Sequence, residues 1–148
     1  MKKRWIVVNV VLAALLGVWL YWEYSVSLGK LLPEENWIRM DLELQSQFDM
    51  NGDIQFSEFP MEQILTQLDA TTVSRAAEKR DLEDKSFRIT LYKEEAWPTV
   101  IYVEPSGRIS IAADMQFDDW KFYEGGETLY VYLTALTIDL PAIYPTLE

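Results

Sequence analysis

A chain of 148 residues that is 49% hydrophobic and 14% aromatic can hold one compact domain plus an anchoring segment, and it is too apolar for wholesale disorder. It contains no Cys and no His, which excludes thiolate nucleophiles, disulfides, imidazole bases and most zinc or iron chemistry. Its formal net charge of −11 disfavours nucleic acid as a partner, and we expect no cofactor.

The first predicted element is a transmembrane helix. Residues 5–22 read WIVVNVVLAALLGVWLYW, in which Asn9 is the one polar residue. A helix of this length covers roughly 27 Å, close to the roughly 30 Å hydrocarbon core of a bilayer. Trp and Tyr at its ends suit the membrane interfaces, and the basic MKKR before it predicts a cytoplasmic N-terminus with the rest of the chain outside the cell membrane.

The alternative is a cleaved signal peptide, because SVS at 25–27 has the small-x-small pattern of a cleavage site. The apolar stretch exceeds the roughly 7 to 15 residues of a signal core, and the bulky YWEY before SVS is a poor approach for a peptidase. These features favour an uncleaved, single-pass signal anchor. Without Cys, the chain is not expected to be a lipoprotein.

We divide the chain into three parts. Residues 1–24 form the cytoplasmic tip and the transmembrane anchor, 25–36 a juxtamembrane linker broken by Gly29 and Pro33, and 37–148 an extracytoplasmic domain. Three basic residues lie in MKKR, so the remainder carries 10 basic against 24 acidic residues, or −14. That remainder is expected to repel anionic lipid headgroups.

The first predicted hairpin follows the linker. Apolar residues recur at every second position from Trp37 to Phe48, the period of a half-buried strand. A three-residue loop at 50–52, with Gly52 in the left-handed position, would pair Phe48 with Ile54 and keep one face of the hairpin apolar. We therefore predict a tight hairpin there.

A second hairpin is predicted in VIYVEPSGRISIA. The loop 105–107 ends in Gly, as a type I turn with a bulge requires, and it places Val103 opposite Ile109 and Ile101 opposite Ile111. The alternating segment SFRITLYK predicts the strand before it.

Two helices complete the predicted domain. PMEQILTQLDA at 60–70 places four apolar residues on one helical face, which should cover the sheet: Met61, Ile64, Leu65 and Leu68. The segment 127–137 fits both a helix and a strand, and the Gly125-Gly126 pair before it favours the helix. The predicted fold class is α+β, with a transmembrane helix followed by antiparallel hairpins and one or two covering helices.

The stretch FDMNGDIQF resembles the first half of a calcium loop, because Asp49, Asn51 and Asp53 stand two apart. An EF-hand also needs Gly at loop position six and Glu at position twelve, and these positions hold Ile54 and Pro60. We interpret the stretch as a turn and keep the three residues as weak metal candidates.

A second acidic group surrounds Asp118 and Asp119, which are also weak candidates for a hard cation; its other members are Asp114, Glu124 and Glu127. A solvated loop is the simpler interpretation. Use of such carboxylates as a general acid and base would require a burial that the sequence cannot reveal.

Aromatic residues supply the candidate ligand face. Tyr92, Tyr102 and Tyr132 fall at strand or helix positions opposite the apolar set, so we expect them at the surface, where aromatic rings can stack on sugars or anchor a protein. No phosphate-binding Gly-rich loop or nucleophile elbow is present in the sequence.

The order of FPMEQILTQLDATT, FRITLYKE, VIYVEPSGRISI and WKFYEGGETLY behind an anchor resembles an uncharacterised family of small membrane-anchored or lipoprotein α+β domains of Gram-positive bacteria. The resemblance covers most of 37–136. It implies a location and a shape, and it carries over no functional residue.

The leading functional hypothesis is a non-enzymatic interaction domain, anchored in the membrane and binding a protein or cell-wall partner. Tethering raises the effective concentration of such a domain near its partner, so weak contacts suffice. Two alternatives are a cation-responsive, calcium-type surface sensor and a cell-envelope hydrolase that uses paired carboxylates.

Overall fold

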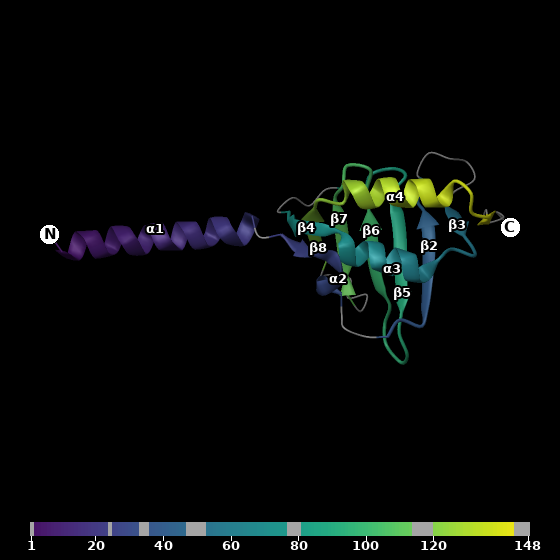
Figure 1. Ribbon diagram of the computed structural model, residues 1–148, viewed down its shortest axis with the longest axis horizontal. Helices are drawn as coiled ribbons and strands as arrows, with labels where there is room; N and C mark the ends of the chain where they lie inside the picture. Colours follow the sequence, from purple (N-terminus) through teal and green to yellow (C-terminus); the bar gives the residue numbers. More distant parts are fainter. Residues whose placement is uncertain are drawn as a thin grey trace.

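The structure is a computed structural model that describes residues 2–23, 25–32, 36–46, 53–76, 81–113 and 120–143. It is an α+β fold in which an apolar helix precedes an antiparallel sheet with helices packed on it (Figure 1). The helices are α1 (Lys2–Glu23), α2 (Leu28–Leu31), α3 (Met61–Ala70) and α4 (Glu127–Thr137). The strands are β1 (Val26–Ser27), β2 (Arg39–Leu44), β3 (Ile54–Phe56), β4 (Thr72–Arg75), β5 (Phe87–Tyr92), β6 (Thr99–Val103), β7 (Ile109–Ala112), β8 (Lys121–Glu124) and β9 (Ala142–Ile143).

All strand pairs between the described residues are antiparallel, and the strand order is β1-β4-β8-β7-β6-β5-β2-β3-β9. Strands β5 to β8 form a central meander. Among the described strands, four connections join strands that are not neighbours in the sheet: β1 to β2, β3 to β4, β4 to β5 and β8 to β9. The connection from β3 to β4 contains α3, and the connection from β8 to β9 contains α4. Both helices lie over the same face of the sheet (Figure 1), which we call the inner face.

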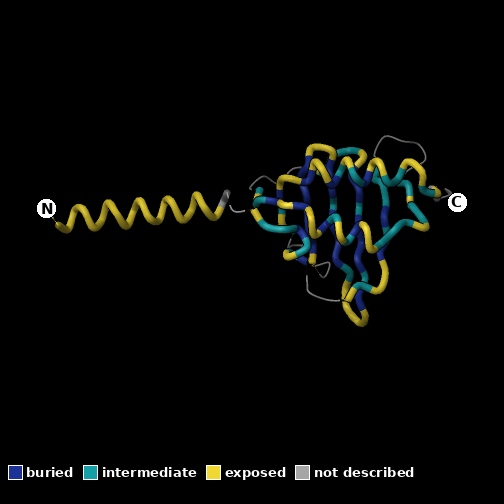
Figure 2. Tube along the Cα trace, in the orientation of Figure 1, coloured by how far each residue is buried: buried dark blue, intermediate teal, exposed yellow. Residues whose placement is uncertain are grey.

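The core lies between the inner face and these helices. Alternation places Ile89 and Ile101 toward the helices, where both are fully buried. Facing them, α3 contributes Ile64 and Leu68, and α4 contributes Leu129 and Leu133. Figure 2 shows the central strands as the most buried part of the chain. The predicted covering helix at 60–70 is confirmed, and 127–137 is a helix that begins after Gly126.

The second hairpin has the predicted register. Val103 pairs with Ile109 and Ile101 with Ile111. The N–H of Gly107 donates to the carbonyl of Glu104 at 2.9 Å, and Gly107 has a φ of 90°, a conformation that a residue with a Cβ rarely adopts. Local turn chemistry therefore determined this connection.

Replacing Gly107 with Ala is expected to destabilise the fold by about 1 to 3 kcal/mol, because the left-handed conformation is strained for Ala. An added Cβ would also lie 2.4 Å from Cδ of Glu127, which must then move. Urea unfolding of the full chain in detergent micelles would measure the change. Gly17→Ala is the matched comparison, since a Cβ there meets nothing within 4 Å. Equal stabilities of the two variants would contradict this reading of Gly107.

The predicted register of the first hairpin is wrong. Ile54 pairs with Leu44, and Phe56 with Leu42, so the connection runs from 45 to 53 and the strand ends earlier than expected. Because the new register differs by four residues, an even number, both registers place the same set of side chains on one face. Strand β2 also pairs with β5 over residues 39–44, so it has a neighbouring strand on each side.

Residues 25–36, expected as a linker, contain β1 and α2 instead. Leu28 is completely buried in the core, and its N–H donates to the carbonyl of Thr71 at 2.8 Å. Gly29 fits there because a Cβ would collide with the side chain of Asp69. Packing against β4 and α3 thus orders a segment whose composition alone suggests a flexible connection, and the folded part begins within three residues of α1.

Helix α1 is long and apolar enough to cross a membrane over Lys2–Tyr21, and none of that span is buried against the rest of the chain. It extends away from the sheet as a single rod (Figure 1). Signal sequences share this length and composition, so membrane anchoring stays a prediction.

Candidate functional site

The face of the sheet opposite the helices, here called the outer face, carries the candidate ligand-binding residues. Strand alternation places Tyr92 and Tyr102 on it, since their neighbours Leu91 and Ile101 point into the core. The structure therefore brings two of the three predicted tyrosines to one face. Both are partly exposed, whereas Val100 on the same face is buried.

Tyr92 is held by two charged residues of the neighbouring strand β2. Its hydroxyl donates to Oδ2 of Asp41 at 2.8 Å, and the guanidinium carbon of Arg39 lies 3.9 Å from the centre of its ring. Arg39 also donates to Asp41 at 3.5 Å. Contacts to both the ring and the hydroxyl fix the orientation of the side chain, so Tyr92 presents a preorganised, amphipathic surface.

Tyr102 belongs to a second aromatic group on the same face. Its ring lies 5.5 Å from that of Trp120, measured between ring centres, and the guanidinium of Arg88 lies 6.0 Å from it. Arg88 approaches Glu43 at 3.9 Å, and Glu43 accepts a hydrogen bond from Gln55 at 3.1 Å. Aromatic rings and charged groups thus alternate across the outer face.

Tyr132 does not join this face. It lies on α4, which packs against the inner face, and its partly buried ring contacts the core. Because α4 lies over the inner face, Tyr132 is on the other side of the sheet. At 3.6 residues per turn it stands roughly 60° from Leu129 around the helix, which brings its ring against the core. Tyr132 is therefore separated by the sheet from Tyr92 and Tyr102.

The acidic metal candidates are not supported by a described cluster. Asp49, Asn51, Asp118 and Asp119 lie outside the described residues. Oδ1 of Asp53 accepts a hydrogen bond from the N–H of Ser46 at 3.1 Å, a turn-stabilising contact. Over the described ranges, no group of three Asp or Glu side chains could hold a metal ion. The calcium-sensor and hydrolase hypotheses stay predictions.

Burial raises the pKa of Tyr92, and the hydrogen bond to Asp41 raises it further. Burial is also the main cause that raises the pKa of Tyr123 and Tyr130. The folded state therefore holds these protons more tightly than the unfolded state, in which each hydroxyl titrates near 10.

The free energy of unfolding is consequently expected to be independent of these groups below pH 10 and to fall as the pH rises through their folded pKa values. Urea unfolding between pH 8 and about pH 11.5 would test this, with Tyr92→Phe expected to show a shallower decline. A decline of equal slope in the variant would show that Tyr92 does not contribute.

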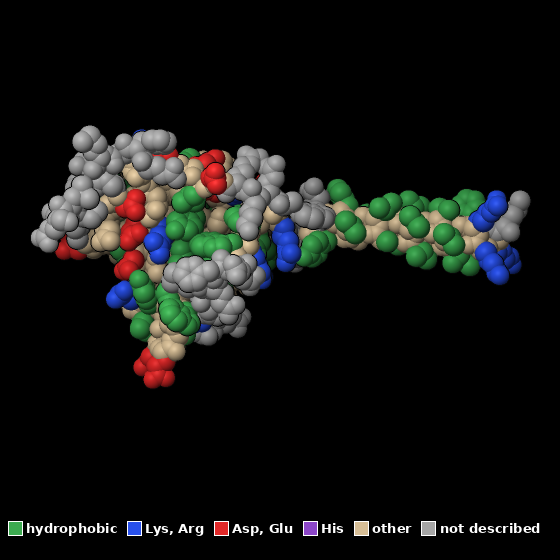
Figure 3. Space-filling model, turned by 180° about the vertical axis from the view of Figure 1, so that it is seen from behind, with side chains coloured by type: hydrophobic (Ala, Val, Ile, Leu, Met, Phe, Trp, Pro, Cys, Tyr) green, Lys and Arg blue, Asp and Glu red, His purple; other side chains and the backbone are tan. Residues whose placement is uncertain are grey.

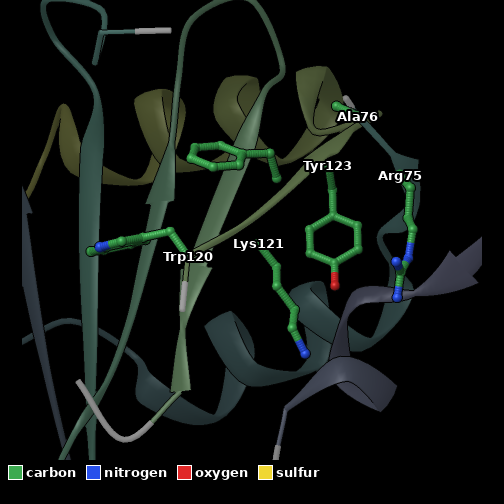
Figure 4. A pocket seen from close by; sticks show the side chains of 6 residues that line it. Arg75, Ala76, Trp120, Lys121 and Tyr123 are labelled. Atoms are coloured by element: carbon green, nitrogen blue, oxygen red, sulfur yellow. The ribbon is translucent and has the colours of Figure 1, made fainter. Parts of the chain in front are cut away.

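A hollow of about 220 Å³ lies at the opposite end of the sheet from β2, near α1. It is lined by Arg75, Ala76, Trp120, Lys121, Phe122 and Tyr123. In Figure 4 the polar ends of Arg75, Lys121 and Tyr123 point in the same direction from the neighbouring strands β4 and β8. Sequence reasoning missed this group because neither β4 nor β8 was predicted as a strand.

Comparisons with family models, with curated proteins and with solved structures find no match to this chain. The resemblance to Gram-positive membrane-anchored domains therefore stays a prediction. The candidate site rests on geometry alone: an outer face on which rigid tyrosines stand beside charged partners, a composition suited to stacking and hydrogen bonding.

Proposed function

We propose that this chain is a single-pass membrane-anchored interaction domain, non-enzymatic, with a cytoplasmic N-terminus and a folded domain outside the cell. Its partner is a protein or a cell-wall component bound by the outer face. The observation that carries the proposal is the fixed orientation of Tyr92 between Arg39 and Asp41.

Contacts made by residues 26–28 support retention of the anchor, because cleavage after residue 27 would remove or disturb them. Val26 and Ser27 pair with Val73 and Thr72, and the hydroxyl of Ser27 donates to the carbonyl of Asp69 at 2.6 Å. Cleavage would eliminate β1 and leave the buried Leu28 at a charged terminus. The folded domain therefore keeps β1 and the buried environment of Leu28 only when α1 stays attached.

Binding by the outer face is supported by its rigidity and its mixed chemistry. The Tyr92 and Tyr102 rings supply apolar contact area at a low entropic cost, because each side chain is already oriented by a neighbour. Arg88 and Glu43 next to them supply hydrogen-bonding groups. A surface of this kind binds by stacking and polar contacts and needs no reactive group.

The test places a photo-crosslinking phenylalanine derivative at Tyr102 or at Tyr132 in cells that express the full chain. We expect a crosslinked partner from position 102 and none from position 132, which faces the opposite side of the sheet. Tyr92→Ala should reduce the yield roughly 30-fold, the effect of losing an aromatic anchor worth about 2 kcal/mol.

A cell-wall partner is tested with the full chain in nanodiscs, sedimented together with isolated wall material. Sedimentation that Tyr92→Ala abolishes would support a wall ligand. Equal crosslinking from both positions, together with sedimentation unaffected by Tyr92→Ala, would refute binding by the outer face.

A further inference from the structure

Two cations next to α1 differ from the other described arginines of the domain. Arg39, Arg88 and Arg108 each approach a carboxylate. For Arg75 and Lys121, the structure gives no ion pair with any carboxylate among the described residues, and both are exposed. Their charges are therefore not neutralised by a carboxylate of the described part of the chain.

These two cations stand together at the hollow between β4 and β8. Arg75 is the cross-strand partner of Tyr123, and Lys121 lies two residues before Tyr123 on the same side of β8. Figure 4 shows the three polar ends pointing the same way. On the face seen in Figure 3, basic side chains lie at the end of the domain next to α1, and the visible acidic side chains lie farther away, with further basic side chains among them.

The hollow lies near the C-terminal end of α1, which is the end expected at the membrane surface. The guanidinium of Arg75 lies 5.0 Å from the centre of the Tyr21 ring, near the end of α1. A helix of 22 residues covers about 33 Å, so its end lies at the boundary of a hydrocarbon core about 30 Å thick. The headgroup layer beyond that boundary is about 6 Å thick, which includes the position of Arg75.

We propose that Arg75 and Lys121 bind the phosphates of anionic lipid headgroups beside the anchor and thereby dock the β4–β8 end of the domain on the membrane. This inference rests on the proposed anchoring by α1. Acidic residues of the domain, Glu124 on β8 among them, oppose it only where they lie within about 8 to 10 Å, because charges beyond that distance are largely screened at physiological salt. Attraction of this end to the membrane orients the domain and leaves the outer face accessible.

The test uses the full chain in nanodiscs of phosphatidylcholine alone or with about one third phosphatidylglycerol. The chain has no Cys, so Thr72→Cys, an exposed position on the strand that α1 contacts, accepts a single fluorophore. Headgroup-spin-labelled lipid, present at the same fraction in both discs, quenches the fluorophore when the domain docks. We expect stronger quenching in the anionic discs, and each basic residue to change the ratio of docked to free domain roughly fivefold.

Arg75→Gln with Lys121→Gln should abolish the difference between the discs, while Lys85→Gln, the same charge change at an exposed site, should preserve it. Circular dichroism of each variant checks that the fold is retained. Equal quenching in both discs, or equal effects of Lys121→Gln and Lys85→Gln, would overturn the proposal. Release by inorganic phosphate at constant ionic strength would assign the hollow to free phosphate and overturn docking on lipid.

Whether the chain is recovered with the discs distinguishes a failure of the proposed anchoring by α1 from a failure of the proposed docking on lipid. A chain that does not remain with the discs would refute anchoring, and docking with it. A chain that remains but shows no lipid dependence would refute docking alone.

Discussion

Replacing Glu104 with Gln is expected to lower the free energy of unfolding by about 3 to 5 kcal/mol, the cost of breaking a buried ion pair by removing one partner. Glu104 is completely buried, and its carboxylate accepts hydrogen bonds from Nε and Nη2 of Arg108. Gln would remove the buried carboxylate that accepts two hydrogen bonds from the guanidinium of Arg108. For a domain with a typical stability of about 5 to 15 kcal/mol, this is a large share.

The loss of unfolding free energy should exceed the contribution of the ion pair itself, because Glu104 and Arg108 also connect two loops. Glu104 also accepts from the N–H of Glu83 at 2.8 Å, and Nη2 of Arg108 donates to the carbonyl of Asp81 at 2.8 Å. Glu83 in turn accepts from the N–H of Ser106 at 3.0 Å. The segment before β5 is therefore held against the β6–β7 loop by polar contacts, most of them to backbone groups that need partners when buried.

Urea unfolding of the full chain in detergent micelles measures the effect, with Glu94→Gln as the exposed comparison, expected to change stability by less than about 0.5 kcal/mol. The double replacement Glu104→Met with Arg108→Leu should cost less than Glu104→Gln, since it leaves no buried charge. If Glu104→Gln matched Glu94→Gln, the ion pair would not contribute to stability.

The comparison of the two hairpins explains how much of the fold could be predicted. Around Gly107 the turn residues and the strand pattern agree on one register, which the structure has. The predicted turn at 50–52 lies outside the described residues, and β2 pairs with β3 in a register that differs from the predicted one by four residues. Alternation could not exclude this register, because it cannot distinguish registers that differ by an even number. Strands β4 and β8 were not predicted because their sequences, TVSR and KFYE, contain no apolar residues at alternate positions.

The sequence pattern indicated which side of the sheet Tyr92 and Tyr102 occupy, whereas it misplaced Tyr132 and did not reveal the partners of the three tyrosines. The positions of Tyr92 and Tyr102 opposite the apolar set placed them correctly on the outer face. Their contacts with Arg39 and Trp120 come from strands that are distant in the sequence, so they depend on the strand order. The charges of Glu104 and Arg108 beside the predicted loop were visible in the sequence, whereas their burial required the return of residues 81–86.

Substitutions in α1 are expected to have the second large effect, which is on retention of the chain in the membrane. Large apolar side chains are exposed along α1, and burying each one stabilises by about 1.5 to 3 kcal/mol, which insertion of α1 into a membrane would supply. Leu12→Arg with Leu16→Arg near the helix centre should oppose insertion by about 5 to 7 kcal/mol, since each Arg costs about 2.5 to 3.5 kcal/mol there. We expect the native chain to stay in the membrane pellet after alkaline carbonate extraction and the double Arg variant to be released.

Leu12→Ala with Leu16→Ala is the matched control, because Ala keeps the helix and adds no charge, so this variant should remain in the pellet. Protease added to cells with a permeable wall should digest the domain of the native chain, as a cytoplasmic N-terminus requires. The mass of the purified chain decides between the anchor and a cleaved leader. A protein that begins after residue 27 and is released by carbonate would show that α1 acts as a signal sequence, and the short connection to β1 would then have no role in holding the domain at the membrane.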